Sequence, residues 1–243
     1  MKKTIFITGA TSGIGKATAE VFAKQGHRLI ICGRRKEVLD NLQIQLSNFT
    51  DVYSLVFDVR NQQEVQNAIN SLPEDWKNID VLVNNAGNAH GLEPISDANI
   101  SDWDAMMDGN VKGLLYVSQP IIKLMKANNS GHIVNISSVA ARQTYANGTV
   151  YCASKKAVDV ISEGMRLELT EFGIKVTNVQ PGAVETDFSK VRFKGDEERA
   201  ATVYAGYEPL IAEDIADAIS YCVNAPERVS IAELCIYPKA QAE

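Results

Sequence analysis

Tyr151 and Lys155 are four residues apart at the start of a predicted helix, so their side chains project from the same helical face. A phenol has a pKa of about 10 and is a weak acid or base at neutral pH, but a nearby ammonium group stabilises its ionised form. The pair could therefore move a proton. By itself this spacing is common, and it also fits a half-buried aromatic side chain beside a surface lysine.

A serine gives the pair a third polar group. Ser138 follows the predicted strand 132–137 and lies thirteen residues before Tyr151. Its hydroxyl could hydrogen-bond a substrate oxygen and stabilise the charge that develops there.

A glycine-rich turn joins the first predicted strand to the first predicted helix, with the sequence Thr8-Gly9-Ala10-Thr11-Ser12-Gly13-Ile14-Gly15. Glycines permit the tight backbone geometry that lets a pyrophosphate approach the positive end of a helix. A plain strand-to-helix connection is the alternative, but the position directly after the first strand favours a nucleotide site.

The end of the second predicted strand carries Arg34 and Arg35, after Cys32 and Gly33. An acidic residue at this place would accept hydrogen bonds from the ribose 2′-OH of NAD, whereas arginine suits the 2′-phosphate of NADP. The two arginines therefore favour NADP over NAD.

The elements that must position these residues alternate between short apolar runs and stretches of helical period, which is typical of βαβ units. We expect an α/β fold: a single Rossmann-like, doubly wound domain of about seven parallel strands with helices on both faces. The predicted strands are Thr4–Thr8, Arg28–Cys32, Val52–Val56, Val81–Asn84, His132–Ser137, Lys175–Gln180 and Leu234–Tyr237. The predicted helices are Gly15–Gln25, Lys36–Leu46, Gln62–Ser71, Trp103–Ala127, Val150–Phe172 and Ala212–Asn224.

Within this domain, residues 1–90 are expected to bind the nucleotide and residues 91–243 to carry catalysis and substrate binding. The least regular segment is expected at 183–210, a long crossover at the carboxyl end of the sheet that could close over a ligand as a lid.

Composition excludes several other classes of protein. The 243 residues carry a formal charge of −6, which argues against a nucleic-acid partner. The four cysteines and three histidines are scattered without metal-ligand spacing, so we expect no metal site. No apolar run approaches the ~20 residues of a membrane span, and the start is too short for a signal peptide, so a cytoplasmic protein with no membrane partner is expected.

Taken in order, these motifs resemble the short-chain dehydrogenase/reductase family over nearly the whole chain. The residues that carry the resemblance are Thr8-Gly9-x-x-x-Gly13-x-Gly15, Asp58-Val59, Asn84-Asn85-Ala86-Gly87, Asn110, Ser138, Tyr151, Lys155 and Pro181-Gly182 followed by Thr186. Within the family the chain is most similar to the NADP-dependent 3-hydroxy acid dehydrogenases, which act on serine and allo-threonine. The segments behind this similarity are Gly33-Arg34-Arg35, Asp58-Val59-Arg60-Asn61, Leu72-Pro73-x-x-Trp76 and Val191–Asp196.

The resemblance implies a role for each matching residue. Tyr151 would exchange the proton of the substrate hydroxyl, Lys155 would hold the nicotinamide ribose and lower the tyrosine pKa, and Ser138 would bind the substrate oxygen. Asn110 would anchor a water chain from Lys155, although a helix residue that bonds neighbouring backbone is the alternative. Ser137 is expected to be structural, because the spacing favours Ser138. The implied cofactor-binding residues are Gly9, Thr11, Ser12, Gly13, Ile14, Gly15, Arg34, Arg35, Asp58, Val59, Asn85, Ala86, Gly87, Tyr151, Lys155, Pro181, Gly182, Val184 and Thr186.

A 3-hydroxy acid carries a carboxylate, and Arg192 in the crossover is the candidate to bind it, with Lys194 second. A solvated loop with charges of both signs is the alternative. The expected function is oxidation of small 3-hydroxy acids such as L-serine, L-allo-threonine and 3-hydroxypropionate, with reduction of the carbonyl product as the reverse reaction.

Two other functions remain open. One is an NADPH-dependent carbonyl reductase of the same family acting on a ketone, a sugar or an acyl thioester. The other is a non-catalytic regulator that senses NADP, against which the Ser138, Tyr151 and Lys155 set argues. The family implies a homotetramer formed through the helices at Trp103–Ala127 and Val150–Phe172, and a dimer is the alternative.

Overall fold

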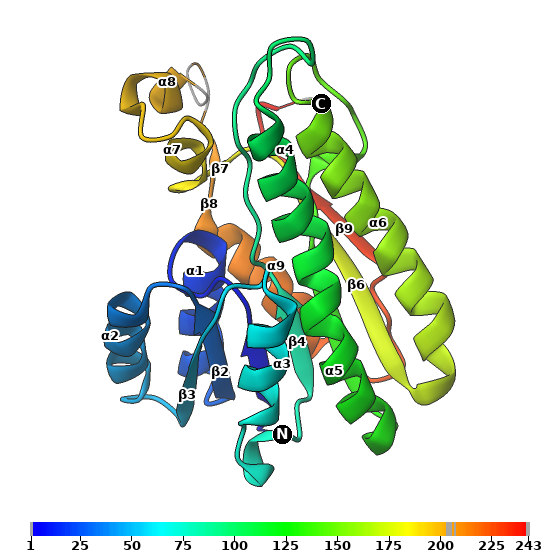
Figure 1. The fold of residues 1–243 in the computed structure, drawn as a ribbon. Helices are drawn as coiled ribbons and strands as arrows, with labels where there is room; N and C mark the ends of the chain where they lie inside the picture. Colours follow the sequence, from blue (N-terminus) through cyan, green and yellow to red (C-terminus); the bar gives the residue numbers. More distant parts are fainter. Residues whose placement is uncertain (1, 203–205, 207, 242–243) are drawn as a thin grey trace.

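Seven parallel strands form the central sheet of the computed structural model, which describes residues 2–202, 206 and 208–241, with residues 200–202 described by their backbone alone (Figure 1). The strand order is β3-β2-β1-β4-β5-β6-β9, so the order reverses between β1 and β4. The strands are β1 (Thr4–Ile7), β2 (Arg28–Gly33), β3 (Val52–Val56), β4 (Val81–Asn84), β5 (Gly131–Ile136), β6 (Ile174–Pro181) and β9 (Glu233–Ile236). This is the doubly wound arrangement in which ligands bind outside the carboxyl ends of the strands at the reversal.

Helices cover both faces of this sheet because successive strand residues point to opposite sides. Ile5 and Ile7 of β1 pack in an apolar cluster with α1 (Gly13–Lys24), α2 (Lys36–Leu46) and α9 (Ala212–Asn224). Phe6 packs on the other face with α3 (Gln62–Asn70), α5 (Gly113–Asn128) and α6 (Thr149–Leu169). Within the described residues, short 3₁₀ helices form at η1 (Glu74–Trp76), η3 (Val139–Ala141) and η4 (Thr170–Phe172). The predicted fold class and all seven predicted strands are confirmed, with ends that shift by at most one residue.

The segment predicted as a helix at Trp103–Ala127 is helical throughout, but it is not a regular α-helix along its whole length. The structure has α4 (Ile100–Met107), a π-helical turn η2 (Asp108–Lys112) and then α5. Asn110 lies in this turn, and its side chain forms hydrogen bonds with neighbouring elements. A π turn of this kind commonly marks a functional site. Hydrophobic periodicity could not reveal it, because the apolar face continues on both sides of the interruption.

The crossover 183–210, which was expected to be the least regular segment, is built from short elements in the part that the structure describes; residues 203–205 and 207 lie outside the described residues. It contains β7 (Val184–Glu185), α7 (Phe188–Arg192), α8 (Glu197–Thr202) and β8 (Leu210–Ile211), and β7 pairs with β8 in a separate two-stranded sheet. Figure 1 shows α7 and α8 standing at the end of the molecule where the strands of the main sheet finish. These elements are too short to give a periodic sequence signal.

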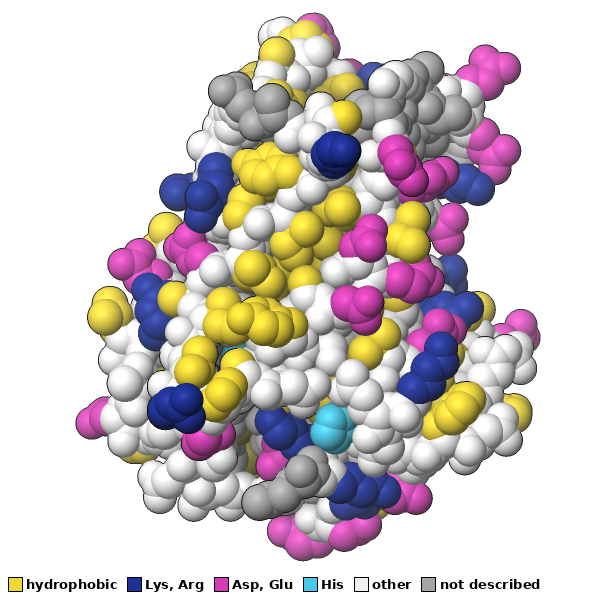
Figure 2. All heavy atoms as spheres, turned by 180° about the vertical axis from the view of Figure 1, so that it is seen from behind, with side chains coloured by type: hydrophobic (Ala, Val, Ile, Leu, Met, Phe, Trp, Pro, Cys, Tyr) yellow, Lys and Arg dark blue, Asp and Glu magenta, His cyan; other side chains and the backbone are white. Residues whose placement is uncertain are grey.

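Exposed hydrophobic side chains occur on several outer surfaces. Leu115 of α5 and Val160 and Leu167 of α6 are among the exposed ones, while Figure 2 shows hydrophobic side chains gathered on the face seen from behind. The predicted tetramer through α5 and α6 stays a prediction. Among the residues that the structure describes, no helix has the length and apolar character needed to cross a membrane.

Candidate active site

A cavity of about 1280 Å³ opens at the carboxyl ends of the strands. Its size exceeds that of a typical small-molecule site. It brings together Ser138, Tyr151, Lys155 and Arg192 with nearly all of the predicted cofactor-binding residues. Those lining it are Gly9, Thr11, Ser12, Gly13, Ile14, Arg34, Arg35, Asp58, Val59, Asn85, Ala86, Gly87, Pro181, Gly182, Val184 and Thr186. Asn110 and Gly15 lie behind its wall.

Ser138 and Tyr151 meet inside this cavity. Ser138 lies just beyond β5 in extended backbone, and its hydroxyl oxygen accepts a hydrogen bond from the Ala140 N–H at 3.1 Å. Its side chain also hydrogen-bonds Tyr151, which is 8% exposed. The phenol therefore has a polar partner placed by a strand end, and an apolar neighbour in Phe188, whose ring centre lies 5.7 Å away.

The ionisation of Tyr151 is set by opposing effects. Burial raises the pKa of Tyr151 above its usual value, and the neighbouring Tyr145 acts in the same direction. The hydrogen bond with Ser138 and the charge of Arg192 both lower this pKa. A buried phenol that must ionise thus depends on the polar and cationic groups around it.

Lys155 lies one helical turn after Tyr151, with its Nζ 6.0 Å from the centre of the tyrosine ring. Its ammonium donates a hydrogen bond to the Ile136 carbonyl at 2.9 Å. Burial lowers the pKa of Lys155 to about 8, and the charge of Asp159 opposes that fall. The lysine is therefore held at the cavity wall with a charge that is sensitive to its surroundings.

Asn110 uses its side chain to join three segments. Its Oδ1 accepts from the Asn88 N–H at 2.7 Å, and its Nδ2 donates to the Asn88 carbonyl at 2.8 Å and to Ser154 Oγ at 3.0 Å. These bonds fix the loop after β4 against α6. The backbone that the side chain contacts is thus that of Asn88, 22 residues away in the sequence, and the water chain stays a prediction.

The glycine-rich turn has the shape that a pyrophosphate site needs. Gly9 and Gly13 have φ of +64° and +51°, and a Cβ on Gly15 would collide with the Gly9 carbonyl and the Asn85 amide. Helix α1 begins at Gly13. The structure describes the whole first turn of this helix, which has no capping side chain and no acidic residue. Its first N–H groups are thus left for an anion, which fits the phosphates of a dinucleotide.

Asn85 and Thr8 hold this turn in place. Asn85 Nδ2 donates to the Thr8 carbonyl at 2.9 Å and the Gly9 carbonyl at 3.2 Å, while Thr8 Oγ1 accepts from the Asn85 and Ala86 N–H groups. The side-chain nitrogen of Asn85, the residue predicted to bind the ribose, is therefore already hydrogen-bonded within the protein.

The two arginines after β2 are placed differently. Arg35 donates from Nη2 to Thr11 Oγ1 at 2.8 Å and Ser12 Oγ at 3.0 Å, so its guanidinium lies against the phosphate turn. Arg34 is 64% exposed and reaches Asp58 Oδ2 at 3.5 Å. The 2′-phosphate of NADP would meet a surface with two positive charges here.

Asp58 is held by a residue that motif matching did not single out as a site residue. Arg60 binds its carboxylate through Nε and Nη2 at 3.0 and 2.6 Å. Burial raises the pKa of Asp58, but the hydrogen bonds and charge of Arg60 outweigh it, so the pKa lies below the usual value. Asp58 is thus fixed as an ionised acceptor at the edge of the predicted adenine site.

Arg192 enters the cavity from α7 beside Tyr151, with its guanidinium carbon 5.6 Å from the tyrosine ring centre. It donates to the Gly91 carbonyl at 3.1 Å and to the Tyr145 hydroxyl at 2.9 Å. Lys194, the second candidate, instead pairs with Asp102 at 2.9 Å and does not line the cavity. The structure therefore separates the two candidate cations.

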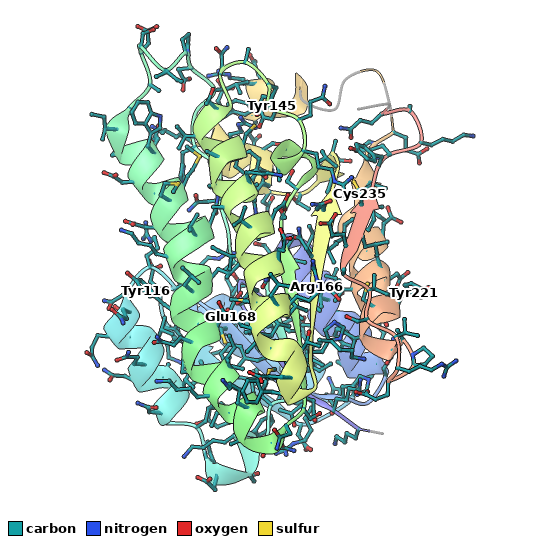
Figure 3. The ribbon with its side chains drawn as sticks, turned by 90° about the vertical axis from the view of Figure 1, so that its right-hand side faces the viewer. Tyr116, Tyr145, Arg166, Glu168, Tyr221 and Cys235 are labelled. Atoms are coloured by element: carbon teal, nitrogen blue, oxygen red, sulfur yellow. The ribbon has the colours of Figure 1, made fainter. Side chains whose placement is uncertain are left out.

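Tyr145 is a site residue that sequence reasoning missed. It lines the cavity, bonds Arg192 and raises the pKa of Tyr151, yet it lies in a polar loop without periodicity. Figure 3 shows it at the end of the molecule where α6 begins. The signal that could have identified Tyr145 as a site residue is its position in the sequence between Ser138 and Tyr151. No cluster of metal-binding side chains occurs among the described residues.

The fold and this site define a class of protein that comparison with known proteins establishes. Residues 3–197 match the family described as short chain dehydrogenase. The chain belongs to the short-chain dehydrogenase family, and it is an oxidoreductase that acts on CH–OH groups.

Individual relatives cover nearly the whole chain. The NADP-dependent 3-hydroxy acid dehydrogenase YdfG of Escherichia coli is 41% identical over 98% of this chain and 96% of its own length. Sulfoacetaldehyde reductase 2 of Chromohalobacter salexigens is 40% identical over 100% of this chain and 96% of its own. Among solved structures, the closed form of serine dehydrogenase complexed with NADP⁺ is similar with a TM-score of 0.95 and 40% identity, covering 99% of this chain and 96% of that one.

Proposed function

We propose that the protein is an NADP-dependent dehydrogenase of small 3-hydroxy acids such as L-serine, L-allo-threonine and 3-hydroxypropionate. The observation that carries this proposal is the position of Arg192, a cation that enters the same cavity as Ser138, Tyr151 and Lys155. A guanidinium 5.6 Å from the ring of the proton-transferring residue can bind a carboxylate two carbons from the reacting hydroxyl.

The preference for NADP is supported by Arg34 and Arg35 at the cavity wall and by the relatives whose names include this cofactor. Gly9, Thr11, Ser12, Gly13 and Ile14 would hold the pyrophosphate at the start of α1. Asp58 and Val59 would contact adenine, Asn85, Ala86 and Gly87 the adjoining ribose, and Pro181, Gly182, Val184 and Thr186 the nicotinamide end. Gly15 would act through the shape of the turn, since a side chain there would displace the Gly9 carbonyl.

Proton transfer is the part of the reaction that the chain itself performs. During oxidation Tyr151 takes the proton of the substrate hydroxyl, and during reduction it returns a proton to the carbonyl oxygen. Ser138 hydrogen-bonds that oxygen and stabilises its negative charge. Lys155 binds the nicotinamide ribose and favours the ionised form of the tyrosine, while Asn110 fixes the loop beside it. Bound NADP supplies the hydride acceptor in this chemistry.

The crossover completes the site. Helix α7 brings Arg192, and Phe188 packs against Tyr151, so this segment would exclude water from the reacting atoms when substrate is present. We propose that it acts as the substrate lid of the catalytic half, residues 91–243, while residues 1–90 bind most of the nucleotide.

A second substrate class is favoured by one observation. The sulfoacetaldehyde reductase relative is as similar as the hydroxy acid dehydrogenase, and the guanidinium of Arg192 could bind a sulfonate as well as a carboxylate. Reduction of a small anionic aldehyde with NADPH is therefore the alternative to hydroxy acid oxidation. A regulator without catalysis is disfavoured, because it would not need a serine, a tyrosine and a lysine in one cavity.

The test is formation of reduced nicotinamide, followed by absorbance, with NADP or NAD and a panel of hydroxy acids and simple secondary alcohols. We expect NADP reduction with the hydroxy acids and a loss of at least about 100-fold in Tyr151→Phe, whose NADPH binding persists. Turnover of sulfoacetaldehyde with NADPH but of no hydroxy acid would select the alternative. Tight NADPH binding without turnover of any substrate would contradict both.

A further inference from the structure

A carboxylate behind the site has no assigned role. Asp159 lies on α6 one turn beyond Lys155, and its side chain is 12% exposed. Its Oδ1 accepts hydrogen bonds from Ser137 Oγ at 2.8 Å and from Asn178 Nδ2 at 2.7 Å. Figure 3 shows α6 lying beside β6, the strand that carries Asn178.

These bonds connect the elements that carry the reacting groups. Ser137 directly precedes Ser138, and its hydroxyl also lies 3.0 Å from the Lys155 carbonyl. Asp159 therefore joins the helix of Tyr151 and Lys155 to the strand end of Ser138. A shift of α6 along the sheet would break these bonds and would change the distance between the serine and the tyrosine.

The hydrogen bonds that Asp159 accepts do not require its negative charge. Both bonds end on one oxygen, so a neutral amide in the same place could accept them equally well. Keeping a mostly buried carboxylate costs desolvation energy unless its charge interacts with something. Lys155 is the buried cation on the same helical face, and burial alone would drive it toward its neutral form.

Other charged groups around Asp159 compete little for this role. Lys156 Nζ lies 3.8 Å from Oδ2, but its side chain is 62% exposed, so solvent screens that pair. The neighbouring strand contributes Glu233, which is next to Asn178 in the sheet register and is paired with Arg142 at 2.7 Å. Asn178 and Ser137 themselves carry no charge.

We propose that Asp159 is a positioning residue of the active site, which fixes α6 to the strand ends and keeps the Lys155 ammonium charged while Tyr151 exchanges its proton. The inference rests on the proposed proton-transfer role of Tyr151 and Lys155. It adds a group that acts through the lysine and does not itself touch substrate or cofactor.

The direct test is the titration of Lys155, which needs no substrate. Lysine labelled with ¹³C at Cε gives one signal for each side chain, and the Lys155 signal is assigned by its absence in Lys155→Arg. In the native protein we expect a midpoint near 8, the value that results from burial and the opposing charge of Asp159 together. In Asp159→Asn the midpoint should fall by about half a pH unit or more, because the variant retains an acceptor oxygen but no charge. An unchanged midpoint would overturn the proposal, whatever substrate the enzyme proves to use.

Glu163→Gln is the matched control. Glu163 is exposed one turn further along α6, so this variant removes one negative charge from the same helix. We expect the native Lys155 midpoint in this variant. An equal fall in both variants would show a general effect of helix charge and would contradict a specific role for Asp159.

A kinetic test separates charge from structure. For reduction of malonate semialdehyde, the carbonyl product of 3-hydroxypropionate, kcat should decrease above the pH at which Lys155 loses its proton. In Asp159→Asn this decrease should begin at lower pH, with about a 2- to 6-fold loss near pH 8, roughly the loss expected for a midpoint lowered by 0.5 to 1 pH unit. The KM for NADPH should change little. A loss of kcat that is equal at every pH would indicate a purely structural role and would overturn the electrostatic part.

Asp159→Glu provides a second variant should the amide fail to fold. It retains the negative charge, so the Lys155 midpoint should stay close to the native value even where the longer side chain lowers stability. A midpoint displaced downward in the glutamate variant would contradict the proposal.

Discussion

The guanidinium of Arg192 lies 5.6 Å from the centre of the Tyr151 ring, although the two residues belong to different helices, α7 and α6. Arg192 is held there by the Gly91 carbonyl and the Tyr145 hydroxyl, and the Arg192 carbonyl in turn accepts from the Gly91 N–H at 3.0 Å. This arrangement places a fixed positive charge next to the group that exchanges the proton.

Arg192→Gln should raise the KM for 3-hydroxypropionate by about 10- to 100-fold, because a charge-assisted hydrogen bond contributes about 1.5–3 kcal/mol. The KM for an uncharged secondary alcohol should stay within about 3-fold of the native value, since such a substrate makes no bond with the guanidinium. Steady-state kinetics with both substrates checks this.

Lys190→Gln serves as the control for that experiment. Lys190 is an exposed cation on the same short helix and pairs with Glu197 at 3.4 Å. Its loss should leave both KM values unchanged. Equal effects of Arg192→Gln on the acid and the alcohol would contradict a carboxylate-binding role.

Arg35 should decide the choice between the two nicotinamide cofactors. Because its guanidinium lies against Thr11 and Ser12, Arg35→Ala should raise the Kd of NADPH by about 10- to 100-fold and should leave that of NADH nearly unchanged. Fluorescence titration of both reduced cofactors measures the difference. Lys36→Ala, which removes a cation paired with Asp40, should leave both constants alone; an equal loss of NADPH and NADH affinity in Arg35→Ala would refute the assignment.

His132 should make the protein less stable in acid. The Thr177 hydroxyl donates to the Ile231 carbonyl, so it accepts from His132 Nε2 at 2.8 Å. The other ring nitrogen, Nδ1, is buried without a hydrogen-bond partner among the described residues, which fits a neutral imidazole. Burial lowers the pKa of His132 from 6.5 to about 3, with the charges of Lys175 and Lys3 acting in the same direction. Between these values the unfolded chain binds the extra proton, so its contribution to stability is present above pH 6.5 and is lost as the pH falls.

The expected slope from this residue is at most about 1.4 kcal/mol of unfolding free energy per pH unit. Urea unfolding of the native protein and of His132→Gln at several pH values between 7 and 4 would show it. The variant should be less stable at pH 7 but should lose less stability on acidification. Parallel losses in the two proteins would mean that other groups cause the acid sensitivity.

The fold was largely predictable because each βα unit has a strong local signal. The apolar run Arg28–Cys32 and the periodic Val38, Leu39, Leu42 and Leu46 indicate a strand and a helix without help from the rest of the chain. The joint placement of Tyr151 and Lys155 follows from helical spacing for the same reason. Ser138 lies near these two residues because the end of β5 and the start of α6 are neighbours at one edge of the sheet. The sheet topology predicts that neighbourhood.

Features set by contacts between distant segments were not predictable. The π turn at Asn110 depends on bonds to Asn88 and Ser154, and the path of the loop with Tyr145 depends on Arg192, 47 residues away. Asp159 carried no signal, because a single acid on a helix face is ordinary. Its partners Ser137 and Asn178 are brought to it by the sheet.

The most direct test of the central claim compares 3-hydroxypropionate with 1-propanol, a three-carbon alcohol in which a methyl group replaces the carboxylate. The measurement is kcat/KM for NADP reduction by the native enzyme with each compound. An anion bound by Arg192 beside Tyr151 predicts a preference of at least about 10-fold for the acid, and about 100-fold if the charge-assisted bond reaches its full strength. Equal values for the two alcohols, or turnover of neither, would contradict the assignment of the protein as a 3-hydroxy acid dehydrogenase.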